Sequence, residues 1–195
     1  MSSEVPATWR GVRNHFDNSI SEEVRSYFEP TVELIENYDW EVSLAFMFTR
    51  VEKAMNMMLY CGARKIHKAH SGTAYAFVDK HHMTRKDFKR LFKNVFGSDI
   101  PAATNELLAE AEKIRNKIIH GKSASPADQR KAIIRLLDYA EAMNVLVYDK
   151  ARFRPFTPTL RGFTGQTQSL DQSTTSWLMR GLGFTGRAEG DEDAN

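Results

Sequence analysis

The chain of 195 residues contains a single cysteine, Cys61, so no disulfide can form within it. Because a lone cysteine is typical of proteins that fold in a reducing compartment, we expect a cytoplasmic protein. Cys61 follows two apolar residues and precedes a glycine, which indicates a buried thiol that packs as a small hydrophobic side chain.

No run of apolar residues approaches the length that crosses a bilayer, and residues 1–10 lack the apolar stretch of a signal peptide. We therefore expect no membrane segment. No β-hairpin signal stands out, and the apolar residues recur mostly at helical spacing. The sequence predicts an all-α fold, a bundle of about five helices followed by a C-terminal extension rich in Gly, Thr and Ser.

The net charge of +2 excludes no class of partner, but the charges are unevenly distributed. Residues 21–41 hold seven acids and one base, whereas residues 61–93 hold nine bases and two acids. A local basic excess is the expected mark of a polyanion site, here RNA. Alternatively, the acidic and basic segments face one another within the fold or across a dimer. Both interpretations fit the sequence.

Four of the six histidines also lie in the basic stretch, at His67, His70, His81 and His82. No cysteine or carboxylate set with the spacing of a zinc site accompanies them. We therefore expect neither a metal nor a cofactor, and interpret these imidazoles as facing solvent or RNA.

Residues 1–20 lack clear periodicity and are predicted to be loose. The acidic start at Ser21 predicts a helix, which Pro30 divides into two short helices or kinks. Asp39 then caps a long apolar helix, Trp40 to Tyr60, which we expect to be buried at the centre and to end at Gly62.

A firmer helix is predicted from Arg85 to Phe96, with Thr84 as its cap and Gly97 as its stop. Its aromatic and aliphatic residues form one face and its basic residues form the other. Such a helix can bind nucleic acid or simply present a solvated surface. The candidate RNA-binding residues are Arg85, Lys86, Lys89, Arg90, Lys93 and, further along the chain, Lys122.

The end of the next helix, Ala102 to His120, carries most of the functional information. Its last residues include Arg115, Asn116 and His120, and Gly121 follows as a left-handed helix stop. Arginine is a fixed fork of donors suited to phosphate oxygens, and histidine moves protons near neutral pH. Together they can cleave a phosphodiester without a metal. The ordinary alternative is that cations complement the helix dipole and cap terminal carbonyls.

At roughly 100° per residue, the apolar stripe of this helix is predicted to face the core, with the polar residues opposite. Two apolar residues, Leu108 and Ile119, interrupt the polar side, and we expect a second copy of the helix to cover them in a homodimer. The predicted core stripe is Leu107, Ala111, Ile114 and Ile118, and the polar side holds Glu112, Arg115, Asn116 and His120.

The pattern Arg115-Asn116-xxx-His120 resembles the R-N/H/D-x-x-x-H signature of HEPN domains. It stands late in a long helix, before a turn and a final amphipathic helix, Pro126 to Tyr148. The resemblance implies an all-α bundle that is usually a homodimer. Many members of the family are metal-independent endoribonucleases, often toxins or phage-defence effectors. Others are inactive and serve as RNA-binding or dimerisation modules.

The resemblance implies a catalytic set of Arg115, Asn116 and His120. The family often has a further polar or acidic residue on an earlier helix, and Glu52 is the best match here. Glu112 is a second supporting candidate. Glu52 also fits an exposed helix residue that simply pairs with a neighbour.

Three segments are expected: a loose segment 1–20, a HEPN-like domain 21–150 and an extension 151–195. In the extension, Gly162-Phe163-Thr164-Gly165 recurs as Gly183-Phe184-Thr185-Gly186, and Trp177 lies between the two copies. The extension is either a loose tail or a docking segment for a partner, such as an antitoxin or the other protomer.

Overall fold

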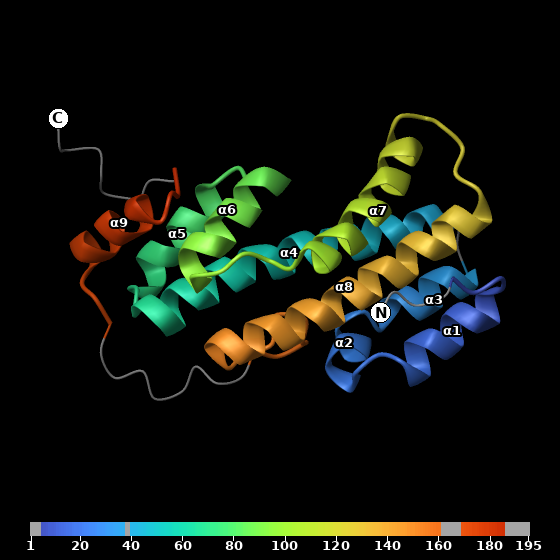
Figure 1. The fold of residues 1–195 in the computed structure, drawn as a ribbon, viewed down its shortest axis with the longest axis horizontal. Coiled ribbons are helices and arrows are strands. Elements are labelled where there is room, and N and C mark those ends of the chain that lie inside the picture. Colours follow the sequence, from blue (N-terminus) through green and yellow to red (C-terminus); the bar gives the residue numbers. More distant parts are fainter. Residues whose placement is uncertain (1–4, 38–39, 161–168, 186–195) are drawn as a thin grey trace. The chain divides into compact units, whose positions relative to one another are not determined.

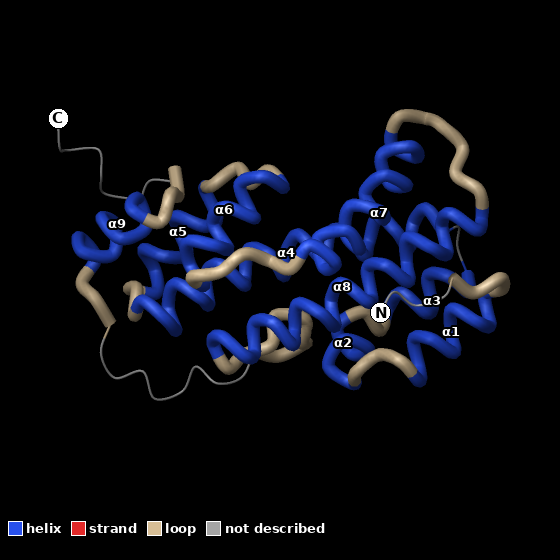
Figure 2. The backbone as a smooth tube through the Cα atoms, in the orientation of Figure 1, coloured by secondary structure: helices blue, strands red, loops and turns tan. Residues whose placement is uncertain are grey.

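A computed structural model describes residues 5–37, 40–160 and 169–185 of the chain. These residues form helices and loops without a strand, which confirms the predicted all-α class (Figures 1 and 2). They contain nine helices rather than about five, because several predicted loops are short helices. The helices are α1 Trp9–Asn18, α2 Glu22–Tyr27, α3 Pro30–Asn37, α4 Trp40–His67, α5 Ser71–Lys80, α6 Arg85–Phe96, α7 Ala102–Ile119, α8 Pro126–Ala151 and α9 Gln172–Gly181.

The chain divides into two compact units. The first unit consists of Met1–Lys53, Pro101–Leu146 and Arg154–Leu160, and the second of Ala54–Ile100, Val147–Phe153 and Arg161–Asn195. Helices α4 and α8 contribute residues to both. This division does not follow the boundaries expected at residues 20 and 150, because each unit combines segments that are far apart in the sequence.

The prediction that residues 1–20 are loose is wrong for the described part of this segment, which contains α1. The Thr8 side chain accepts a hydrogen bond from the Gly11 N–H and caps the helix. Val12, Phe16 and Ile20 recur every four residues and are all buried. Only Val12 and Phe16 lie on α1 itself, so the periodic signal is weak, and the helix depends on packing against the rest of the first unit.

Pro30 begins α3, so this region forms two short helices, with Ser21 capping α2. Tyr27 of α2 belongs to an aromatic cluster. The ring centroids of Tyr27 and Tyr139 lie 5.5 and 6.1 Å from that of Phe156. The buried Asn144 amide accepts from the Phe156 N–H at 2.8 Å and donates to its carbonyl at 3.0 Å. The start of the extension is therefore part of the core of the first unit.

A charge network joins α1, α7 and α8 in the first unit. Arg135 is only 7% exposed, and its Nε donates to Glu110 of α7 at 2.8 Å. Its Nη1 lies 3.7 Å from Asp138, which in turn meets His15 Nε2 at 3.0 Å. The hydrogen bond from Arg135 lowers the pKa of the Glu110 carboxyl, assisted by Lys131 and opposed by burial. These contacts fix α7 against α8 and so position the end of α7.

Helix α4 continues through Gly62 to His67, so the predicted stop at Gly62 is wrong. A Cβ at Gly62 would lie 2.6 Å from Val95 Cγ1 and 2.7 Å from Phe96 Cζ. Glycine is needed here for the close approach of α6 to α4, not for a turn. The predicted stop of α6 at Gly97 is confirmed by a φ of 72°. The predicted cap of α4, Asp39, lies outside the described residues.

Cys61 is buried, at 1% exposure, as the sequence indicated. Burial raises the pKa of its thiol to about 12, against the opposite effect of Arg64 and Lys65. The thiolate is the reactive form of cysteine, so this side chain is an inert part of the core of the second unit.

Helix α9 packs on α5 in the second unit (Figure 1). Asp171 caps α9, and Thr175 Oγ1 accepts a hydrogen bond from the His70 N–H at 2.8 Å. Beyond α9, Asn94 of α6 donates to the Leu182 carbonyl at 2.8 Å. The described part of the extension therefore folds onto its own chain, while the first copy of its repeat, residues 162–165, lies outside the described residues.

Candidate functional site

The end of α7 has the geometry that Gly121 predicts. Gly121 has a φ of 68°, and its N–H donates to the Ile118 carbonyl at 2.9 Å. The Lys122 N–H donates to the Lys117 carbonyl, also at 2.9 Å. This is a Schellman stop, in which orphan carbonyls of the last turn are satisfied by the backbone. His120 is the C-terminal cap, one residue beyond the last helical position.

The buried face of α7 differs from the predicted one. Leu108 is 3% exposed, so its assignment to a dimer interface is wrong: its side chain lies in the core of its own unit. At roughly 100° per residue, the buried stripe is rotated by roughly 40° from the predicted one, toward Leu108 and Arg115. Leu107 and Ile118 are only half-buried in consequence. The buried residues of α7 are Thr104, Leu108, Ala111 and Ile114.

This rotation places Arg115 at the edge of the buried stripe, against α4. Its Nη2 lies 3.8 Å from Glu52 Oε1, and its guanidinium carbon lies 5.0 Å from the centroid of the Phe48 ring. Phe48 and Glu52 are four residues apart and so share one face of α4. Arg115 therefore lies over an aromatic ring and beside a carboxylate, with its side chain 35% exposed.

Glu52 is the acidic residue proposed from the sequence as a supporting group, and the structure brings it to Arg115. The Glu52 side chain is 55% exposed. An ion pair this exposed contributes about 0–1 kcal/mol to stability, so its main effect is on the direction of the guanidinium. The sequence predicted that the helix carrying Phe48 is buried, but not that Phe48 contacts Arg115; the spacing of Phe48 from Glu52 was the available signal.

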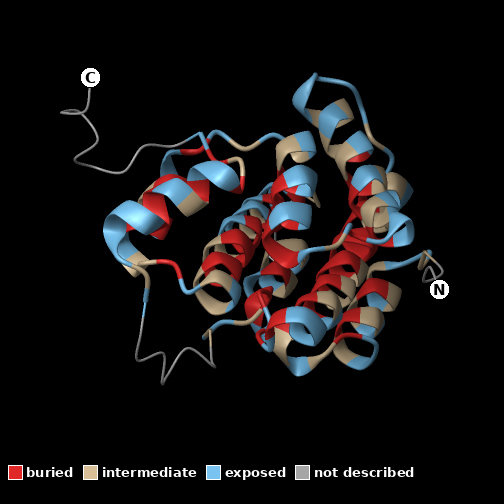
Figure 3. Cartoon of the chain, turned by 60° about the vertical axis from the view of Figure 1, so that its left-hand side comes forward, coloured by how far each residue is buried: buried red, intermediate tan, exposed pale blue. Residues whose placement is uncertain are grey.

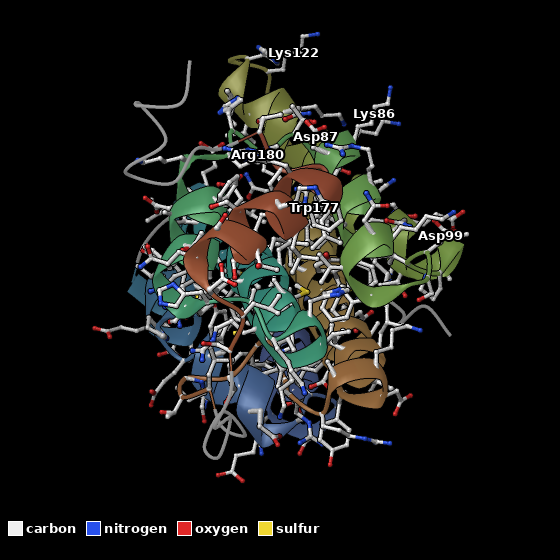
Figure 4. All side chains as sticks on the ribbon, turned by 90° about the vertical axis from the view of Figure 1, so that its left-hand side faces the viewer. Lys86, Asp87, Asp99, Lys122, Trp177 and Arg180 are labelled. Carbon is white, nitrogen blue, oxygen red and sulfur yellow. The ribbon has the colours of Figure 1, made fainter. Side chains whose placement is uncertain are left out.

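The other two motif residues, Asn116 and His120, are exposed. They are four residues apart along α7, so they are neighbours on one surface of the helix. Glu112, one turn before Asn116, is half-buried. Lys122 is exposed in the loop that follows α7 (Figure 4). The end of α7 thus presents an amide, an imidazole and an ammonium group to solvent.

The loop after His120 is held at both ends. Lys117 Nζ lies 3.6 Å from Asp128 of α8, and the Asp128 N–H donates to Ser125 Oγ at 3.1 Å. Burial acts to raise the pKa of the Asp128 carboxyl, but Lys117 and Ser125 outweigh it and lower the pKa. The predicted cap at Ser125 and first helical position at Pro126 are confirmed. These contacts limit how far the turn that carries His120 can move.

The five candidate RNA-binding residues of α6 belong to the second unit, whereas the motif belongs to the first. Arg85 Nη1 lies 2.8 Å from Met55 Sδ, Arg90 pairs with Asp87 at 3.4 Å and Lys93 pairs with Asp99 at 2.9 Å. Lys86 and Lys89 are exposed, and neither forms an ion pair with any residue that the structure describes.

The four histidines of the basic stretch do not gather into one site. Among the described residues, no group of three or more His, Cys, Asp or Glu side chains could hold a metal ion. The interpretation that they face solvent or RNA is wrong for His81, which is buried, whereas His67 and His70 are half-buried and hydrogen-bonded within the chain. His67 Nε2 meets the Val95 carbonyl at 2.9 Å, His70 caps α5, and His81 Nδ1 accepts from the Thr185 N–H at 3.1 Å. The partners of His67 and His81 are distant in sequence, so composition alone could not reveal them.

A separate hollow of about 630 Å³ lies in the first unit, on the helices of the N-terminal region. Arg13 crosses it, at 2.6 Å from Asp17 and 3.7 Å from Glu36. The motif of α7 contributes no residue to it. The hollow is lined by Arg13, Phe16, Arg25, Ser26, Glu29, Pro30, Val32, Glu33 and Glu36.

None of the helices in the described ranges is long and apolar enough to span a membrane. Comparison of the chain with models of known protein families, with curated proteins and with solved structures found no match. The likeness to HEPN domains consequently rests on the Arg115-Asn116-xxx-His120 pattern and on its place at the end of α7.

Proposed function

We propose that this protein is a metal-independent endoribonuclease of the HEPN type. The observation that carries the proposal is the setting of Arg115, held beside Glu52 and over Phe48 on the same helix end that exposes Asn116 and His120. A guanidinium can bind phosphate oxygens and a solvent-accessible imidazole can transfer protons, and both roles serve metal-free cleavage of RNA.

RNA supplies its own nucleophile in this reaction, the 2′-hydroxyl next to the scissile phosphate. The 2′-oxygen forms a bond to phosphorus as its proton passes to a base, and the bond to the 5′-oxygen breaks as that oxygen receives a proton. His120 serves as the base or as the acid. The products are a 2′,3′-cyclic phosphate and a 5′-hydroxyl.

Arg115 stabilises the negative charge that builds on the phosphorane, where donors fixed in advance are most effective. Its planar group carries five N–H donors, and the contact with Glu52 at 3.8 Å leaves most of them for phosphate oxygens. Asn116 orients His120 or holds a phosphate oxygen. Glu112 on α7 and Lys122 in the loop after it flank these residues in the sequence and add one acidic and one basic group.

A homodimer gives the reaction its second proton-transfer group. One imidazole takes up a proton at the 2′-oxygen, and the His120 of a second copy delivers one to the leaving oxygen. Ile119, next to His120, is 60% exposed and offers an apolar contact for such a pairing. Leu108 takes no part, since it is buried within its own unit.

The cellular role that follows is a cytoplasmic toxin or phage-defence effector, kept inactive by a protein partner such as an antitoxin. The sequence suggested the extension, residues 151–195, for that contact. Because residues 169–185 pack on their own unit through their inner face, the partner would have to bind the outer face of α9.

Incubation with RNA in EDTA tests the nuclease proposal. The wild-type protein is expected to cleave, and His120→Ala to lose roughly 10²- to 10⁴-fold in rate, the usual loss for a general acid–base. His82→Ala, which removes another exposed histidine, is the matched control and is expected to be unchanged. Cleavage that requires a divalent ion, or that His120→Ala leaves undiminished, contradicts the proposal.

The second candidate function is a non-catalytic HEPN-like module that binds RNA or a nucleotide, or that only dimerises. The exposure of Ile119 beside the motif favours it. It predicts RNA binding or self-association that survives Arg115→Ala, together with no cleavage product under any condition. A binding affinity that falls steeply with salt, without product, would select this function.

A further inference from the structure

The most exposed large apolar side chain among the described residues is Trp177 of α9, at 75% exposure. The opposite face of the same helix is buried through Thr175, Ser176 and Met179 (Figure 3). Helix α9 is thus firmly seated on its unit while it holds a large aromatic ring outward. A single exposed apolar residue is ordinary, so the surroundings of Trp177 decide its meaning.

The first relevant feature of those surroundings is charge. Among its described residues the second unit has twelve lysines and arginines against five acids, a net charge of +7. The described residues of the first unit include thirteen lysines and arginines and fourteen acids, which gives a net charge of −1. Among the described residues the basic excess is therefore confined to the unit that carries Trp177, and this favours a polyanionic ligand there.

The second feature is the contact between the end of α9 and the basic helix α6. Arg90 Nη2 donates to the Gly183 carbonyl at 3.2 Å, and Asn94 Nδ2 donates to the Leu182 carbonyl at 2.8 Å. Gly183 has a φ of 97°, and a Cβ there would lie 2.1 Å from Arg90 Nη1. The fit requires glycine at this position. The hydrogen bonds from Arg90 and Asn94 fix the C-terminal end of α9 against α6, less than two helical turns beyond Trp177.

Figure 4 shows Trp177 and Arg180 of α9 in the same view as Lys86 of α6. Lys86 and Lys89 are exposed and form no ion pair with the described residues. The candidate surface consists of Trp177 on α9 together with Lys86 and Lys89 on α6, the helix against which the end of α9 is fixed, and it offers an indole ring and two exposed ammonium groups.

We infer that this surface binds single-stranded RNA, with an unpaired base stacked on Trp177 and the adjoining phosphates on Lys86 and Lys89. Aromatic rings interleaved with cations match the alternation of bases and phosphates in a single strand. A duplex hides the faces of its bases and so could not stack a base on Trp177. The inference rests on the proposed function for its ligand class, and it assigns the second unit to holding the strand rather than cutting it.

Tryptophan fluorescence gives a direct test, because the other two tryptophans, Trp9 and Trp40, lie together in the first unit at 6.1 Å between ring centroids. In a Trp9→Phe/Trp40→Phe/His120→Ala protein, Trp177 is the sole reporter and the strand is not cut. Titration with poly(U) is expected to quench its emission, as stacking requires. Emission that poly(U) leaves unchanged overturns the inference.

Affinity for poly(U) in the His120→Ala background gives the second measurement. Trp177→Ala is expected to weaken binding by roughly 5- to 150-fold, the usual range for one stacked base, and Trp177→Phe to retain most of it. Lys86→Ala/Lys89→Ala is expected to lower the salt slope by about 1.4. Tyr148→Ala, which removes another partly exposed aromatic ring of the same unit, is the matched control and leaves binding unchanged.

Equal affinity of the His120→Ala and His120→Ala/Trp177→Ala proteins for poly(U), with unchanged circular dichroism, overturns the inference. So does binding of polyglutamate that is as sensitive to Trp177→Ala, which would assign the surface to an acidic protein partner. Cleavage in EDTA is measured separately. If cleavage persists while Trp177 has no effect on binding, only this inference fails. If Trp177 governs binding but no product forms, only the nuclease proposal fails.

Discussion

The guanidinium of Arg115 lies 3.8 Å from the carboxylate of Glu52, and the two residues come from helices α7 and α4, far apart in the sequence. Both belong to the first unit. The contact joins the residue proposed to stabilise the phosphorane to the residue proposed to orient it, and it does so at the exposed end of α7.

Replacing Glu52 by Gln is expected to lower the rate of RNA cleavage by on the order of 10-fold, because an arginine with a less defined direction meets the phosphorane less often in the productive geometry. The free energy of unfolding should change by less than about 1 kcal/mol, since the pair is exposed. Rate measurements and urea unfolding check both parts. Glu41→Gln, an exposed carboxylate change on the same helix, is the control, and an equal loss in both variants would refute a special role for Glu52.

Leu108 and Ile119 were expected to act alike, and the structure separates them. Leu108→Ala should lower the free energy of unfolding by ~2–5 kcal/mol, because it leaves a cavity in the first unit. Ile119→Ala should change it by less than about 0.5 kcal/mol, because the side chain is largely exposed. Urea unfolding distinguishes them. A costly Ile119→Ala with a harmless Leu108→Ala would contradict the buried face described for α7.

Gly62→Ala should destabilise the protein by about 1–3 kcal/mol, because the added methyl group would press on Val95 and Phe96 where α6 meets α4. Gly181 is the matched control: a Cβ there meets nothing within 4 Å, so Gly181→Ala should be neutral or slightly stabilising. Thermal unfolding of the two variants tests this. Similar effects of both would show that Gly62 is not a packing glycine.

Stability should depend on pH through His81, whose pKa is lowered from its ordinary 6.5 by burial, against the opposing effect of Asp87. Its Nδ1 accepts hydrogen bonds from Thr185, which requires the unprotonated nitrogen. Between the lowered folded value and 6.5 the unfolded chain binds more protons, so the contribution of His81 is complete above pH 6.5 and is lost as the pH falls through that window.

Unfolding in urea between pH 7.5 and pH 5 measures this dependence. His81→Gln keeps an acceptor near Thr185 but does not titrate, and its free energy of unfolding should fall less than that of the wild type across this range. Identical pH profiles for the two proteins would rule out His81 as the source.

The features that the sequence predicted well are those set by neighbouring residues. Thr84 with Gly97, and Ser125 with Pro126, mark helix ends through local hydrogen bonds or backbone angles, and the structure has each of them. Gly121 belongs to the same group. For the same reason the positions of Arg115, Asn116 and His120 at the end of α7 could be placed in advance.

The features that were missed depend on partners elsewhere in the chain. Gly62 resembles a helix stop in the sequence, and only the close approach of Val95 and Phe96 shows why glycine stands there. His67 and His81 form hydrogen bonds with backbone groups that no local sequence pattern predicts. The rotation of the buried face of α7 likewise follows from what packs against it. Glu52 is the exception, because the family resemblance suggested a partner for Arg115 that spacing alone could not.

The most direct test of the central claim is the chemistry of the cut ends. RNA incubated with the protein in EDTA should yield fragments that end in a 2′,3′-cyclic phosphate and begin with a 5′-hydroxyl, as mass spectrometry can determine. RNA of the same sequence with 2′-O-methyl groups should remain intact, because its nucleophile is blocked. Fragments with 3′-hydroxyl and 5′-phosphate ends, or cleavage of the 2′-O-methyl strand, would contradict the assignment of Arg115 and His120 to this reaction.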